Sequence, residues 1–187
     1  DQVAIAVASN FSVPMRSIIQ EFESASGHSV RVSFASTGKL YAQIINGAPF
    51  DILLSADQAA PKKMLDSGVA LTGTRRSYAI GQLVLWSNDG PEAYSAQERL
   101  IRKSFHKVAI ANPRFAPYGL AAAQVLEKLQ LTNETPHALV YGENIAQVYQ
   151  FVKTANADLG FIAASQIVGQ QLPKRVKFWR VPQSLHE

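Results

Sequence analysis

The sequence predicts an α/β protein with two lobes, each built on a mostly parallel sheet that is flanked by helices. Before residue 70, three short apolar runs are each followed by a polar loop and an amphipathic helix, which is the pattern of a parallel sheet with right-handed crossovers. A long extended run at 78–87 leads into a second series of the same kind, and an alternating run at 176–182 is typical of a strand that returns toward the first lobe. We therefore assign residues 1–80 and 181–187 to lobe 1 and residues 81–180 to lobe 2.

The first strand and helix are well marked in the sequence. Residues 3–8 are continuously apolar, which favours a central strand buried on both faces. The helix after it carries Pro14 in its first turn, and Gly27 stands just beyond its end. A second strand is predicted at 30–34, where apolar and polar residues alternate.

The next two helices of the first lobe also begin at polar residues. Thr37 has a hydroxyl that can cap a helix running to Asn46, because its oxygen can accept an N–H of the first turn. A third strand at 51–55 precedes Asp57, which is expected to cap a helix that ends at Gly68.

The second lobe is predicted to repeat this alternation of strands and helices. Its expected elements are a helix at 96–104, a strand at 108–111, a helix at 120–129, a helix that opens at 145 and a strand at 158–163. Asn144 is expected to cap the helix at 145, which leaves the Ile145 N–H among the unpaired donors. In the loop 112–119, two prolines stiffen the chain and Gly119 permits a close approach of the backbone at the helix start.

The loops that follow the first two strands have the composition of an anion site. Residues 9–12 and 35–38 are small and polar, and each leads into a helix N-terminus whose N–H groups favour an anion. Ligands of parallel sheets lie beyond the carboxyl ends of the strands, so the two loops can serve one site. An ordinary capped helix is the alternative for each loop. A phosphate-binding loop is excluded, because Ser33 stands where its motif needs glycine.

Composition limits the function. Apolar residues make up 47% of the chain and charged residues 17%, which indicates a packed core rather than disorder. The net charge of +4 comes from scattered side chains, whereas a nucleic-acid protein more often has a basic stripe, so we expect no nucleic-acid partner. No apolar run is long enough to span a membrane. The chain enters a strand directly after Asp1, so we expect a mature protein with its signal peptide removed.

The sequence offers little support for an enzyme. The four histidines are far apart and have no metal-ligand spacing, no Gly-x-Ser-x-Gly motif is present, and the chain has no cysteine. Only a dispersed Ser/His/Asp site stays open as an enzymatic alternative.

Six motifs run through the chain in order: Ala-Ser-Asn at 8–10, Phe-Ala-Ser-Thr at 34–37, Gly-Ala-Pro-Phe-Asp-Ile-Leu-Leu-Ser-Ala-Asp at 47–57, Pro-Tyr-Gly at 117–119, Glu-Asn-Ile at 143–145 and Leu-Gly-Phe at 159–161. On these motifs the chain closely resembles the periplasmic molybdate-binding proteins, the solute receptors of molybdate ABC importers. The resemblance implies a type II solute-binding fold, with two lobes that are joined by two hinge strands and close on the anion.

The resemblance also implies the site. The oxyanion-binding residues that it gives are Ser9, Asn10, Ser36, Thr37, Tyr118 and Ile145. Asn10 and Thr37 would use hydroxyl or amide groups, Tyr118 and Ile145 would use backbone N–H groups, and the two serines are close neighbours of these donors. Molybdenum would thus be bound only as its oxyanion through Asn10, Thr37, Tyr118 and Ile145, with no cofactor and no catalytic residue. Ala163 stands where some members have a tyrosine hydroxyl, so Tyr118 is expected to contribute instead.

The function implied is capture of molybdate, and of tungstate, between the lobes for delivery to the membrane permease of an ABC importer. We expect a periplasmic monomer. The family usually continues past residue 187 with a further strand and a long helix, so the C-terminal part of lobe 1 is expected to be missing here. Two alternatives remain: a binding protein for another tetrahedral oxyanion such as sulfate or phosphate, and the ligand-sensing domain of a transcription regulator.

Overall fold

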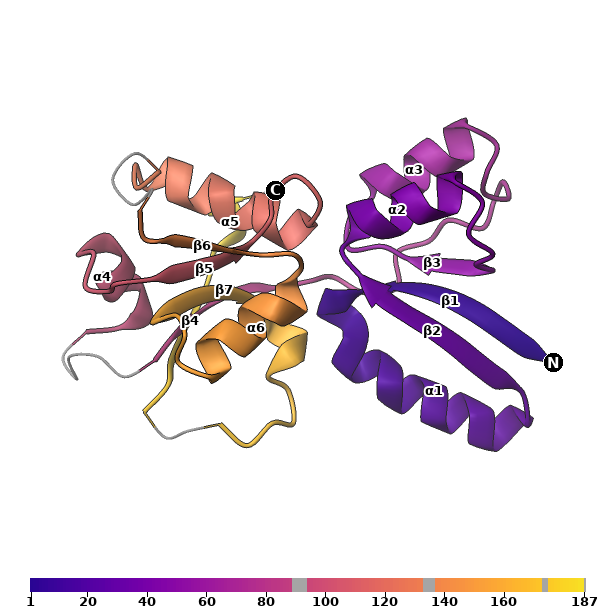
Figure 1. The fold of residues 1–187 in the computed structure, drawn as a ribbon, viewed down its shortest axis with the longest axis horizontal. Helices are drawn as coiled ribbons and strands as arrows, with labels where there is room; N and C mark the ends of the chain where they lie inside the picture. The colour runs from indigo at the N-terminus through magenta and orange to yellow at the C-terminus, as the bar shows by residue number, and fades with distance from the viewer. Residues whose placement is uncertain (89–93, 133–136, 173–174, 187) are drawn as a thin grey trace. The chain divides into compact units, whose positions relative to one another are not determined.

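The computed structural model describes residues 1–88, 94–132, 137–172 and 175–186. The chain divides into two compact units, Asp1–Ile80 and Gly81–Glu187 (Figure 1). Each unit has its own sheet and its own apolar core. Among the residues described, no helix has the length and apolar character needed to cross a membrane.

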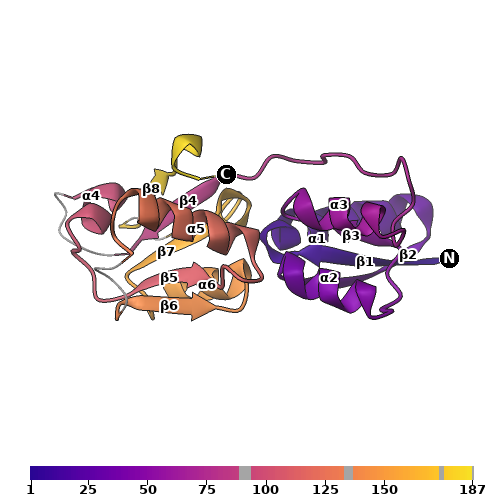
Figure 2. The ribbon, with the colours of Figure 1, turned by 90° about the horizontal axis from the view of Figure 1, so that it is seen from above.

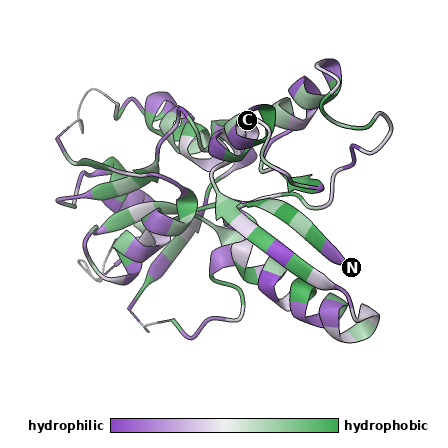
Figure 3. Cartoon of the chain, turned by 45° about the vertical axis from the view of Figure 1, so that its right-hand side comes forward, coloured by the Kyte–Doolittle hydropathy of each residue, from purple (hydrophilic) through white to green (hydrophobic). Residues whose placement is uncertain are grey.

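The first unit is a three-stranded parallel sheet with helices on both faces. Its elements are β1 (Gln2–Ala8), η1 (Ser9–Phe11), α1 (Ser12–Ser26), β2 (Ser29–Ala35), α2 (Thr37–Ile45), β3 (Ile52–Leu54) and α3 (Ala59–Asp66). The strand order is β2-β1-β3, and α1 lies on one side of the sheet with α2 and α3 on the other (Figure 1). The apolar run is therefore the central strand, as predicted, and it is mostly hydrophobic along its length (Figure 3).

The register of this sheet determines where its loops lie. Ala8 pairs with Ala35, so β1 and β2 end at the same level. The first residues of η1 and of α2 consequently start side by side at the carboxyl edge of the sheet. Gly27 closes α1 in the left-handed region at φ 69°, a conformation that glycine adopts without strain.

The second unit is a five-stranded mixed sheet. Its elements are β4 (Leu83–Ser87), α4 (Ala96–Ile101), β5 (Val108–Ala111), α5 (Pro117–Lys128), β6 (Leu139–Gly142), α6 (Ile145–Lys153), β7 (Leu159–Ala163), η2 (Ala164–Gln166), β8 (Lys177–Arg180) and η3 (Gln183–Leu185). The strand order is β6-β5-β7-β4-β8, in which β4 runs antiparallel to both of its neighbours. Strand β4 is buried on both faces: Leu83 and Leu85 point into one core cluster, while Val84 and Trp86 point into the other.

The segment between the two sheets differs from its prediction. Only Leu83–Ser87 of the expected extended run at 78–87 is a strand. Residues 71–80 are exposed and have no helix or strand, and Ile80 is 95% exposed. Figure 2 shows this part of the chain as an extended trace between α3 and β4. Residues 78–80 therefore form no sheet hydrogen bonds, because no strand in the described part of the chain pairs with them.

The C-terminal residues also differ from their assignment. The sequence assigns 181–187 to lobe 1 and predicts that the strand at 176–182 returns to it, but the described part of this segment lies in the second unit. Strand β8 pairs with β4, and the Val181 N–H donates to Leu83 O at 3.0 Å. Leu185 packs against the core beside α5.

Two further elements depart from the sequence expectations. Strand β6 was not anticipated, since its four residues carry no clear alternation, and it pairs with β5 at the edge of the sheet. Helix α4 is shorter than the predicted 96–104 and ends at Ile101.

Candidate anion-binding half-sites

Four of the predicted site residues meet at the carboxyl edge of the first sheet. Ser9, Asn10, Ser36 and Thr37 are 4%, 8%, 3% and 1% exposed, so four polar residues are buried next to the ends of β1 and β2. Buried polar groups require hydrogen-bond partners, and the partners that the fold supplies show what is left for a ligand.

Ser9 joins the two loops to each other. Its Oγ donates to the carbonyl oxygen of Ala35 at 3.2 Å. The proton of this hydroxyl is therefore used within the protein, and Ser9 positions its neighbours rather than offering its side chain as a donor.

Thr37 is the first residue of α2, and its side chain does not cap the helix. Ser36 is the N-cap residue and its side chain makes no cap bond, so the prediction that Thr37 caps α2 is wrong. Instead, Thr37 Oγ1 accepts the Ala56 N–H at 3.1 Å. This bond orients the hydroxyl through its oxygen and leaves the O–H to donate to another acceptor.

Ser36 is the least satisfied of the four residues. Its Oγ is buried and has no hydrogen-bond partner among the described residues. A buried hydroxyl without a partner costs free energy, about 1–3 kcal/mol. An acceptor atom from a ligand would remove this cost. Asn10, in the middle of η1, is buried beside the same strand ends.

The second unit presents two further helix N-termini at the ends of adjacent parallel strands. Ala111 in β5 pairs with Gly142 in β6, and the Asn112 N–H donates to Gly142 O at 2.8 Å. Helix α5 starts after β5 and α6 starts after β6, so both helix starts lie at this edge.

Tyr118 supplies the first backbone donor of α5. Pro117 precedes it and has no N–H, and the N–H groups of Gly119 and Leu120 both donate to Ala116 O. Gly119 brings this helix start against β5, because a Cβ at residue 119 would overlap the Ala111 carbonyl oxygen. The close approach expected from the sequence is therefore present.

Asn144 caps α6 as predicted. Its Oδ1 accepts the N–H groups of Ala146 at 3.0 Å and Gln147 at 3.1 Å. Gln147 Oε1 in turn accepts the Glu143 N–H. Within the described chain, the Ile145 N–H is the first-turn donor of α6 that has no acceptor, which is the donor that the sequence singled out.

Sequence reasoning missed Gln166. This residue is 2% exposed, its Oε1 accepts the Ala163 N–H at 2.9 Å, and its Nε2 donates to Ile145 O at 3.1 Å. It thereby holds the end of β7 against the first turn of α6. A glutamine in a turn gives no sequence signal, since its two partners come from different elements. Ala163 itself is fully buried in the core, so no hydroxyl is supplied at that position.

The chemistry of both half-sites is that of neutral donors. None of the six predicted residues carries a charge, and the described residues contain no cluster of His, Cys, Asp or Glu that could hold a metal ion. Hydroxyl groups and helix N-termini favour an oxyanion through oriented dipoles.

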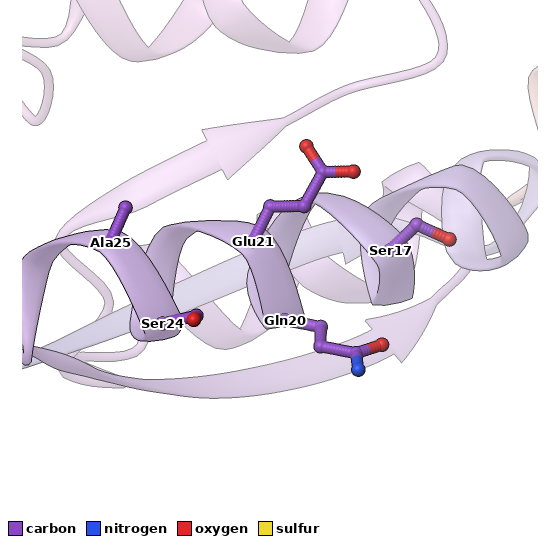
Figure 4. A pocket seen from close by; sticks show the side chains of 5 residues that line it. All are labelled: Ser17, Gln20, Glu21, Ser24 and Ala25. Carbon is purple, nitrogen blue, oxygen red and sulfur yellow. The ribbon is translucent and has the colours of Figure 1, made fainter.

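A hollow on the outer face of α1 is a poor alternative. It is lined by Ser17, Gln20, Glu21, Ser24 and Ala25, whose side chains project from one helix (Figure 4). Its only charged group is the Glu21 carboxylate, which repels an anion.

Comparison with known proteins places the chain in a family. Residues 3–187 match the family model described as bacterial extracellular solute-binding protein. The chain belongs to this family. The resemblance drawn from the sequence motifs is confirmed at the level of whole proteins, as two curated relatives and one solved structure show.

These solute-binding proteins include relatives of high identity. The chain is 46% identical over 187 residues to the molybdate-binding protein ModA of Azotobacter vinelandii, covering all of this chain and 74% of that protein. It is 41% identical over 186 residues to ModA of Rhodobacter capsulatus, covering 72% of that protein. The solved periplasmic molybdate-binding protein of Azotobacter vinelandii matches 99% of this chain and 81% of its own, with a TM-score of 0.91 and 35% identity. The fold is therefore that of a type II periplasmic binding protein.

Proposed function

We propose that this solute-binding protein is the molybdate receptor of an ABC importer. The observation that carries the proposal is the pair of unsatisfied donors at the motif loops: the Ser36 hydroxyl in the first unit and the Ile145 N–H in the second. The identity to two molybdate-binding proteins over the full chain supports the same ligand class.

The proposed donors are neutral and suit a tetrahedral oxyanion. They are the Thr37 and Ser36 hydroxyl groups, with Asn10, in the first unit, and the backbone N–H groups of Tyr118 and Ile145 in the second. Ser9 holds the first-unit loops in place through Ala35. Molybdenum is bound only as its oxyanion, and no catalytic step is involved.

Selectivity follows from the size of the ion. Molybdate and tungstate have nearly the same size and charge, so we propose that both bind. A smaller ion such as sulfate leaves some donors unpaired, and each buried unpaired donor costs roughly 1–3 kcal/mol. We further propose that the protein acts as a monomer in the periplasm, that it delivers the ion to a membrane permease, and that it binds no nucleic acid.

Calorimetric titration of the ligand-free protein tests the proposal. Molybdate and tungstate are expected to bind with one ion per chain, and sulfate and phosphate are expected to give no heat. Stronger binding of sulfate or phosphate would overturn the ligand assignment but keep the oxyanion site. The absence of binding heat with all four ions would overturn the proposed receptor function of this chain.

The remaining parts of the proposal need separate measurements. Light scattering at several concentrations tests the monomer, and a dimer mass would overturn it. Fluorescence anisotropy with labelled duplex DNA at low salt tests the transcription-regulator alternative, because nucleic-acid binding is strongest there.

A further inference from the structure

Gly81, the first residue of the second unit, lies against the side chain of Tyr118. A Cβ built at residue 81 would overlap the Tyr118 phenol oxygen and would lie 3.1 Å from its Cζ. The backbone at Gly81 is outside the left-handed region. The neighbouring tyrosine, and not the backbone conformation, is therefore what excludes a side chain here.

The Tyr118 ring is tied to the start of α5. It packs against both core clusters of the second unit. On either side of it in the chain, Pro117 restricts φ and Gly119 abuts the Ala111 carbonyl oxygen. Because the ring is packed against both clusters, it has little room to rotate away, so a group that displaces it also strains the backbone of residue 118 and the direction of its N–H.

We propose that Gly81 is a positioning residue for the oxyanion half-site of the second unit. Because glycine has no side chain, residue 81 leaves space for the Tyr118 phenol. The packed ring in turn holds the Tyr118 N–H in the direction needed for binding. Gly81 also directly follows the exposed segment 71–80, so a backbone change at this end of the segment acts on Tyr118. The inference rests on the proposed function, in which the Tyr118 N–H is a ligand donor.

A double-mutant cycle tests the contact. Gly81→Ala is expected to weaken molybdate binding about tenfold, because the added methyl group displaces the phenol. Tyr118→Phe keeps the backbone N–H and removes the oxygen that the methyl group meets. Gly81→Ala combined with Tyr118→Phe is therefore expected to bind more tightly than Gly81→Ala alone. Ser77→Ala, an exposed change in the same segment, is the control and is expected to leave affinity unchanged.

A second readout needs no ligand. Amide hydrogen exchange at residues 118–122 is expected to be faster in Gly81→Ala than in the parent, and to be slowed again by Tyr118→Phe. A purely structural role for Gly81 would lower the melting temperature without a selective change at this helix start. If Gly81→Ala does not fold, recovery of folding by Tyr118→Phe is the expected result for the same contact.

Two outcomes overturn the inference. One is parental affinity and parental exchange in Gly81→Ala, and the other is a double variant as impaired as Gly81→Ala alone. The proposed function fails in a different way: the parent itself would bind no oxyanion. The exchange measurement then still decides whether Gly81 controls the start of α5.

Discussion

At the scale of single residues, the polar groups of the half-sites divide into those that we propose as ligand donors and those that hold these donors in place. Thr37 uses its oxygen to accept the Ala56 N–H and keeps its O–H for another acceptor. Ser9 and Gln166 use their hydrogen-bonding groups within the protein. Side chains that are already oriented by internal hydrogen bonds lower the ordering cost of binding.

Replacement of Thr37 tests its proposed O–H donor. Thr37→Ala is expected to weaken molybdate binding by about 1–2 kcal/mol, because one donor is removed from a buried site. Thr37→Ser keeps the hydroxyl and is expected to retain most of the affinity. Thr154→Ala removes an exposed hydroxyl that donates to Gln150 O and accepts from Asn156 Nδ2, and serves as the control in the same calorimetric titration. Unchanged affinity in Thr37→Ala would remove this residue from the site.

Replacement of Asn144 separates helix capping from ligand binding. Asp caps a helix about as well as Asn and favours the helix dipole, so Asn144→Asp is expected to keep the thermal stability of the protein. Its negative charge next to the Ile145 N–H repels the oxyanion, and molybdate binding is expected to weaken by about tenfold or more at low salt.

The control for this charge is Asn156→Asp, an exposed residue in the turn after α6. It adds the same charge away from the helix start and is expected to change affinity little. Raising the salt concentration is expected to reduce the effect of Asn144→Asp, since residue 144 is partly exposed and salt screens such charges. Parental affinity in Asn144→Asp at low salt would contradict the placement of the anion at α6.

At the scale of elements, the short helices of the second unit begin where specific local contacts stabilise their first turns. Helix α6 is capped by Asn144, and α5 begins where Gly119 allows contact with β5. Helix α4 has a capping box: the Glu98 N–H donates to Ser95 Oγ at 3.2 Å, and the Ser95 N–H donates to Glu98 Oε2 at 2.8 Å. Short helices depend on such contacts because their nucleation is unfavourable.

The capping box of α4 gives a pH dependence. The hydrogen bonds from the backbone and the side chain of Ser95, with a smaller effect of Arg102, lower the pKa of Glu98 from its usual 4.5. A carboxylate with a lowered pKa in the folded state stabilises the protein above its unfolded pKa, and this stabilisation is lost as the pH falls through the folded pKa. Glu98→Gln is therefore expected to lower the melting temperature near neutral pH and to lower it less in acid.

Differential scanning fluorimetry between about pH 7 and pH 3 measures this difference. Glu127→Gln, an exposed carboxylate change on α5, is the control for general surface charge. A melting-temperature difference that grows in acid would contradict the assignment. The effect is expected to be small, because Glu98 is exposed to solvent.

At the scale of the whole molecule, the two units have cores of different size. The second unit has two extensive clusters of buried apolar residues, one on each face of its sheet. The cluster of the first unit is centred on Ile5, Val7 and Met15, and Leu40 and Met64 are buried besides. Ile45 and Ile52 are nearly half exposed in this unit. A smaller buried apolar area gives a smaller driving force for folding.

Calorimetric unfolding is expected to reflect this difference. The ligand-free chain should unfold in two transitions, the first unit before the second, because each unit has its own core. Molybdate should raise the transition temperature of a unit that binds it, since a ligand that binds only the folded state stabilises that state by mass action. Sulfate at the same concentration is the control. A single transition that molybdate does not shift would contradict both the separate cores and the proposed binding.

The sequence by itself determined the elements and the donors that depend on near neighbours. Periodicity placed β1, α1, β5 and β7 closely, and Asn144 could be identified as a cap because its partners lie two and three residues away. The Ile145 N–H followed from that cap. Such contacts are local, so the order of residues along the chain is enough to predict them.

Only the tertiary structure decided the contacts between distant segments. Thr37 was misread as a cap because its partner, Ala56, lies 19 residues away and is brought close by folding of the first unit. The same holds for Gln166 with Ile145, for Gly81 with Tyr118, and for the packing of residues 181–186 on the second unit. Local sequence sets which groups can bond, whereas strand register and helix packing set which of them meet.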